Sequence, residues 1–160
     1  MQFIDIKAIH AHSAARIDEA VAKVFEHGRY INGPEVYELE ATLGKFLGDS
    51  KPLHCIAVAS GTMALEVALR ALGIGPGDEV ITTPFTWIST AETIALVGAT
   101  PVFADIEPDT YNIDPKEVEK VITPKTKAII PVDLFGQLPD YTALETIAEK
   151  HGLKILEDAA

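Results

Sequence analysis

The sequence has 160 residues, 48% of them hydrophobic and 23% charged, which is ordinary for a soluble globular protein and enough for one domain. Its formal net charge of −11 repels a phosphodiester backbone, so we expect no nucleic-acid partner. The apolar stretches are too short for a membrane span, and the N-terminus lacks the basic and apolar regions of a signal peptide. We therefore expect a cytoplasmic protein with no membrane partner.

Two helices are predicted in the first third of the chain. Apolar residues at helical spacing predict the first over residues 14–27, with Gly28 as its stop. Pro34 is suited to the first position of a second helix that ends at Gly48. Its apolar side consists of Val36, Leu39, Leu43, Phe46 and Leu47.

The rest of the chain alternates between strand and helix patterns. Strands are predicted over residues 53–58, 79–83, 100–104, 127–132 and 153–156. Helices are predicted over residues 62–72, 86–97 and 141–150, and another begins at Asp114 with Pro115 in its first position. This order predicts an α/β fold of three layers, a mostly parallel sheet with helices on both faces.

Ligands of open parallel sheets bind beyond the carboxyl ends of the strands, so the residues that follow each strand are the candidates. Ser60, Gly61 and Thr62 open a helix whose first amides could hold a phosphate, although an ordinary helix cap is the alternative. Trp87 could stack on a flat ring or belong to the core. Asp158 ends an apolar strand, where it could face a protonated ring nitrogen, cap a helix or form an ion pair.

A phosphate cradle, a ring platform and an anion for a ring nitrogen together match pyridoxal 5'-phosphate (PLP). Asp133 and Gln137 follow another strand and have no single interpretation. His10 and His12 have no third metal ligand nearby in the sequence, so we predict no metal site.

The sequence resembles the DegT/StrS family of PLP-dependent nucleotide-sugar aminotransferases, which have the aspartate aminotransferase-like large-domain fold. The resemblance covers essentially the whole chain. The matching stretches are residues 30–36 (YINGPEV), 60–65 (SGTMAL), 75–81 (GPGDEVI), 84–87 (PFTW) and 157–160 (EDAA).

The resemblance implies a role for each site residue. Gly61 and Thr62 would hold the cofactor phosphate, with Ser60 nearby. Trp87 would stack on the pyridine ring, and Asp158 would bind the ring nitrogen as a catalytic group. The resemblance also implies a homodimer, with residues 1–50 as an N-terminal helical segment and residues 51–160 as the first part of the PLP-binding large domain.

The family's Schiff-base lysine and its small C-terminal domain lie beyond Ala160, so we expect the 160 residues alone to be inactive. Three segments, residues 3–7, 30–36 and 86–93, look most like enzymes of amino-sugar or surface-polysaccharide biosynthesis that aminate a UDP-linked 3-keto amino-sugar uronate, with glutamate as donor. Enzymes acting on dTDP-linked keto deoxysugars remain close competitors. A PLP-dependent sugar dehydratase, in which histidine replaces the lysine, and a non-catalytic phosphate-binding domain are the open alternatives.

Overall fold

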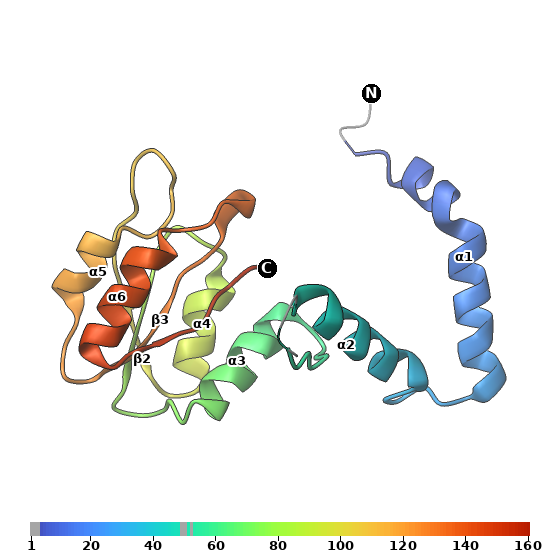
Figure 1. The fold of residues 1–160 in the computed structure, drawn as a ribbon, viewed down its shortest axis with the longest axis horizontal. Coiled ribbons are helices and arrows are strands. Elements are labelled where there is room, and N and C mark those ends of the chain that lie inside the picture. The colour runs from blue at the N-terminus through green and yellow to red at the C-terminus, as the bar shows by residue number, and fades with distance from the viewer. Residues whose placement is uncertain (1–3, 49–50, 52) are drawn as a thin grey trace. The chain divides into compact units, whose positions relative to one another are not determined.

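The computed structural model describes residues 4–48, 51 and 53–160. The chain divides into two compact units, the first ending at Ala57 and the second beginning at Val58. Two helices make up most of the first unit, and the second unit contains a sheet with helices packed against it (Figure 1). Among the described residues, no helix combines the length and apolar character needed to cross a bilayer.

The first unit contains helices α1 (Ile6–His27) and α2 (Pro34–Leu47). Helix α1 begins well before the predicted residue 14, because the Asp5 side chain accepts a hydrogen bond from the amide of Ala8 and caps it there. It ends at Gly28, whose φ of 65° suits glycine. The predicted bounds of α2 are confirmed, with Pro34 first and Gly48 as its C-cap.

The strand predicted over residues 53–58 is wrong, because this segment is not paired with any strand of the described chain. Its main chain contacts α2 instead. The carbonyl oxygen of Leu53 lies so close to Gly44 that a Cβ there would be 2.6 Å away, and the amide of Ala57 donates to the Glu40 carboxylate at 2.8 Å. Ile56 is 75% exposed, so the apolar run is not buried as a core strand would be.

The second unit is built on a parallel sheet, as predicted. Its strands are β1 (Glu79–Thr82), β2 (Thr100–Phe103), β3 (Thr126–Ile130) and β4 (Lys154–Ile155), in the order β2-β1-β3-β4. All three strand pairs are parallel, so the carboxyl ends of the strands meet at one edge. An isolated parallel bridge between Val132 and Asp158 extends the β3–β4 pairing toward that edge.

Helices cover both faces of this sheet, which confirms the three-layer prediction (Figure 1). They are α3 (Gly61–Ala71), α4 (Ile88–Leu96), α5 (Pro115–Val121) and α6 (Tyr141–His151). Side chains alternate along a strand, so neighbouring residues enter different layers. Val80 packs with α3 and α4 residues such as Leu69 and Ile94, whereas Ile81 packs with α5 and α6 residues such as Val118 and Leu144.

Candidate functional site

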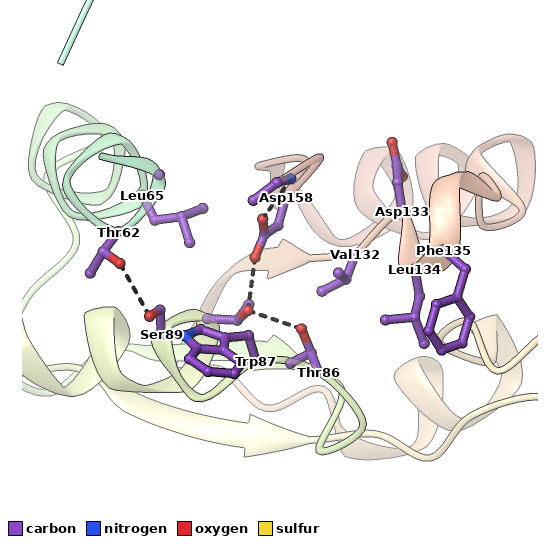
Figure 2. Close-up of a pocket in the computed structure, with 13 residues that line it drawn as sticks. Thr62, Leu65, Thr86, Trp87, Ser89, Val132, Asp133, Leu134, Phe135 and Asp158 are labelled. Atoms are coloured by element: carbon purple, nitrogen blue, oxygen red, sulfur yellow. Dashed lines mark hydrogen bonds between the residues drawn. The ribbon is translucent and has the colours of Figure 1, made fainter. Parts of the chain in front are cut away.

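A cavity of about 330 Å³ lies at the carboxyl edge of the sheet, where the parallel topology predicts a ligand site (Figure 2). The first turns of α3 and α4 form part of its wall, and the segments that follow β1, β3 and β4 form the rest. It is lined by Gly61, Thr62, Leu65, Thr86, Trp87, Ser89, Thr90, Val132, Asp133, Leu134, Phe135, Asp158 and Ala160.

The N-terminus of α3 presents two free amides to this cavity. Ser60 is the N-cap, and its Oγ accepts a hydrogen bond from the amide of Met63 at 3.2 Å. The amides of Gly61 and Thr62 precede the first intrahelical bond and have no hydrogen-bond partner among the described residues. Ser60 therefore acts as a cap, and the Gly61 and Thr62 amides are the groups free to bind an anion at the positive end of the helix dipole.

Gly61 leaves open space in front of these amides. A Cβ built on Gly61 would meet only the Ala160 methyl carbon within 4 Å, at 3.6 Å, which is an ordinary contact. Local packing therefore does not require glycine at this position. The gap fits an anion that approaches the main chain more closely than a side chain would permit.

Trp87 lies at the N-terminus of α4 and lines the cavity with 78% of its surface exposed. A core aromatic residue would be buried, so that alternative is wrong for the described chain. Phe135, which is 83% exposed, borders the same cavity and adopts a positive φ of 57° in the 3₁₀ turn after β3. Both aromatic side chains are available to contact a flat ligand.

Asp158 is a buried carboxylate facing the cavity, with only 7% of its surface exposed. Its Oδ2 accepts a hydrogen bond from Thr90 Oγ1 at 2.8 Å, and its Oδ1 accepts one from the amide of Ala160 at 3.3 Å. Within the described residues it forms no ion pair with a lysine, arginine or histidine. A buried carboxylate without a cation is costly, so this position favours a cationic ligand group.

A second acidic residue, Asp133, lines the same cavity after β3. Asp133 accepts a hydrogen bond from the Tyr141 hydroxyl at 2.8 Å, and Figure 2 shows Asp133 pointing away from Trp87. Burial and this hydrogen bond raise the pKa of the Tyr141 phenol well above its usual range, so it stays a donor. Hydrogen bonding with the neighbouring Asp133 carboxyl raises the pKa of the Glu157 carboxyl, although Glu157 is otherwise exposed. Tyr141 and Glu157 thus both interact with Asp133.

The structure brings four of the five predicted site residues to one cavity: Gly61, Thr62, Trp87 and Asp158. Ser60 adjoins it as the cap. Gln137 does not line it, and its main-chain oxygen accepts a hydrogen bond from Asn112 instead.

Sequence reasoning missed Thr86 and Thr90, which connect to Asp158 through their hydroxyl groups. Their four-residue spacing at the start of a predicted helix places both on one helix face. That spacing is a signal that could have identified them as a pair.

Comparison with known proteins gives a consistent result. The family model described as the DegT/DnrJ/EryC1/StrS aminotransferase family matches residues 12–160. A Pseudomonas aeruginosa relative, UDP-2-acetamido-2-deoxy-3-oxo-D-glucuronate aminotransferase, is 52% identical over all 160 residues. The chain spans 44% of that relative's length.

Solved structures match the fold closely. The structure of DesV from S. venezuelae in complex with a ketimine intermediate has a TM-score of 0.94 at 44% identity. The match covers 99% of this chain and 42% of DesV. NtdA from Bacillus subtilis, with the cofactor PMP bound, has a TM-score of 0.88 at 36% identity, over 92% of this chain and 33% of NtdA.

The TM-scores show that these solved structures share the fold of the described residues. The chain belongs to the DegT/DnrJ/EryC1/StrS aminotransferase family.

Proposed function

We propose that the complete protein binds PLP in the cavity at the carboxyl edge of the sheet and transfers an amino group to a keto sugar nucleotide. The observation that carries the proposal is the convergence of three unlike groups on one cavity: two free helix amides, an exposed tryptophan and a buried carboxylate without a cation. PMP, which one relative binds, is the aminated form of PLP.

Each group has a distinct task in this proposal. The amides of Gly61 and Thr62 bind the cofactor phosphate, and the gap at Gly61 lets it approach. Trp87 stacks on the pyridine ring. Asp158 accepts a hydrogen bond from the ring nitrogen and neutralises its positive charge, which also removes the cost of burying that carboxylate.

PLP, when bound, supplies an electron-withdrawing ring that eases proton removal from the substrate carbon. Asp158 holds the proton on the ring nitrogen. Leu65 and Val132 form an apolar wall of the cavity, which excludes water and strengthens the interaction of Asp158 with a cation. No lysine of the described residues lines the cavity, and the family resemblance places the Schiff-base lysine beyond Ala160.

For the substrate, we propose a UDP-linked 3-keto amino-sugar uronate, with glutamate as the amino donor. The support is the P. aeruginosa relative, whose name states a UDP-linked 3-oxo uronate and whose identity with this chain extends over all 160 residues. Because this chain spans 44% of that relative's length, the test uses the complete protein.

The test combines cofactor binding with product analysis. The complete protein is titrated with PLP, bound cofactor is followed by its visible absorbance, and a Trp87→Leu variant serves as the comparison. The bound protein is then given glutamate and either the UDP-linked or a dTDP-linked keto sugar. Amino transfer to the UDP-linked sugar supports the proposal. Transfer only to the dTDP sugar refutes the substrate, release of a dehydrated sugar refutes the reaction, and absence of PLP binding refutes the function.

We also propose a homodimer. Support comes from the family resemblance and from the first unit, where none of the α1 residues is buried and apolar side chains such as Ile9, Ile17 and Phe25 are exposed. Apolar surface of this kind is typical of contact with another chain. Sedimentation of the complete protein at increasing concentration measures this directly, and a monomer at all concentrations refutes it.

A further inference from the structure

A chain of hydroxyl groups leads to Asp158 from α4. Thr90 Oγ1 donates to Asp158 Oδ2 at 2.8 Å, and Thr86 Oγ1 lies 3.2 Å from Thr90 Oγ1. The dashed lines in Figure 2 follow this chain from Thr86 to Asp158. Thr90 is 1% exposed, so water does not compete for its hydroxyl.

The direction of each hydrogen bond in this chain follows from the bond to Asp158. Thr90 Oγ1 is the donor to Asp158 Oδ2, so the single Thr90 hydroxyl hydrogen points to Asp158. The Thr90 oxygen is then left as an acceptor, and Thr86 must be its donor. One carboxylate thereby fixes the orientation of two hydroxyl groups.

We propose that Thr90 is a positioning residue that, together with Thr86, aims the Asp158 carboxylate at the ligand in the cavity. This inference rests on the proposed function, because the ligand group is the protonated ring nitrogen of PLP. With Oδ2 held by Thr90 and Oδ1 held by the Ala160 amide, the carboxylate cannot rotate without losing a hydrogen bond. A fixed acceptor binds a cationic donor more tightly than a rotating one.

The same turn of helix also ties Trp87 to Asp158. The amide of Thr90 donates to the carbonyl oxygen of Trp87 at 3.2 Å, while its hydroxyl bonds to Asp158. Thr86 directly precedes Trp87, and its hydroxyl group is hydrogen-bonded to that of Thr90. Thr90 therefore links the main chain at Trp87 to the Asp158 carboxylate, and a ligand that contacts both residues would depend on this link.

A neighbouring threonine shows that this arrangement is not the default for the residue type. A threonine inside a helix usually bonds to a carbonyl of the preceding turn, and Thr93 does so, with its hydroxyl 3.2 Å from the Thr90 carbonyl oxygen. Thr90 instead bonds to a side chain 68 positions away in the sequence. Thr93 is also fully buried in α4, which makes it a matched control.

The test compares Thr90→Val, Thr90→Ser and Thr93→Val in the complete protein. Valine keeps the branched shape but replaces the hydroxyl with a methyl group, whereas serine keeps the hydroxyl. We expect Thr90→Val to weaken PLP binding about 2- to 10-fold, because the Asp158 side chain must then be ordered when the ligand binds. With ¹⁵N-labelled PLP, its ring-nitrogen resonance should move toward the unprotonated position. Thr90→Ser should keep the PLP affinity and the ring-nitrogen resonance of the unmodified protein. Thr93→Val should change thermal stability alone.

A second measurement separates this inference from the proposed function. In the cofactor-free protein at neutral pH, the carboxyl ¹³C resonance of Asp158 should shift in Thr90→Val but not in Thr90→Ser or Thr93→Val. If the unmodified protein binds no PLP, the proposed function fails, and this resonance still decides whether Thr90 positions the carboxylate. The inference is overturned if Thr90→Val leaves the resonance unchanged, or if Thr93→Val shifts it equally.

Discussion

Gly61 offers a substitution that separates ligand binding from folding. A Cβ at this position would meet only the Ala160 methyl carbon, at 3.6 Å, and the residue is outside the left-handed region, so Gly61→Ala introduces no clash. Alanine favours a helix over glycine by up to about 1 kcal/mol. The unfolding free energy of Gly61→Ala should therefore be unchanged or raised by up to about 1 kcal/mol.

The same methyl group should obstruct a phosphate. In a helix each Cα–Cβ bond tilts toward the N-terminus, which is the direction in which the free amides of Gly61 and Thr62 point. The methyl group would displace a phosphate oxygen from at least one amide. A hydrogen bond to a charged group contributes about 1.5–3 kcal/mol, so PLP affinity should fall about 10- to 100-fold.

The assay measures dissociation constants of PLP and of pyridoxal, which lacks the phosphate, in the complete protein. Gly61→Ala should weaken PLP binding and leave pyridoxal binding nearly unchanged. Gly75→Ala is the matched control, because a Cβ there would meet only the Val97 carbonyl oxygen, at 3.7 Å, and the site is away from the cavity. If Gly61→Ala binds PLP as tightly as the unmodified protein, the amides do not hold the phosphate and the reasoning is refuted.

Three further predictions concern acidity and packing. Asp158→Asn should weaken PLP binding about 10- to 100-fold in equilibrium dialysis, because the ring nitrogen loses its charged acceptor; unchanged affinity would exclude that contact. The pKa of Glu157 is raised by hydrogen bonding with Asp133, so the stability contributed by its proton is lost as pH rises through that pKa, and the effect is small because Glu157 is exposed. Melting of Glu157→Gln should therefore show a gain over the unmodified protein that grows from acid to neutral pH, and a gain independent of pH would contradict this. Leu69→Ala should lower the unfolding free energy by about 2–5 kcal/mol in urea, because Leu69 is fully buried, whereas exposed Val67→Ala should change it far less.

Much of the second unit could be predicted from the sequence, because its signals are local. Asp114 followed by Pro115 marks the start of α5, and Gly152 ends α6 with a φ of 68°. Such caps depend on the residue itself and on its immediate neighbours. The apolar strand patterns succeeded where a partner strand follows in the chain, as β3 does for β1.

The two fold errors have different causes. The apolar segment at residues 53–58 has strand composition, but local composition does not report partners: its Ala57 amide donates to Glu40, and its Leu53 carbonyl lies against Gly44 in α2. The early start of α1 depends on a local signal that the prediction overlooked, which is the Asp5 side chain capping the amide of Ala8.

Prediction of the site had a similar limit. The sequence places Asp158 at a strand end, where three interpretations were open. The structure adds a hydrogen bond from Thr90 and shows no ion pair of Asp158 among the described residues. The contact between Thr90 and Asp158 joins positions 68 residues apart, and no local pattern encodes it. The residues after the strand ends could nevertheless be assigned to one site from the sequence, because the carboxyl ends of parallel strands meet at one edge of the sheet.

The bridge between Val132 and Asp158 has a consequence for how this site can change in evolution. Consecutive residues after a strand serve opposite layers: Asp158 contacts α4 through Thr90, while Glu157 interacts with the Asp133 side chain, which α6 holds through Tyr141. Substitutions at position 157 can thus change the surroundings of Asp133 without changing a residue that lines the ligand cavity. Insertion or deletion of a single residue after β4 would exchange the two carboxylates, so a length change here would disturb the site more than a substitution at position 157.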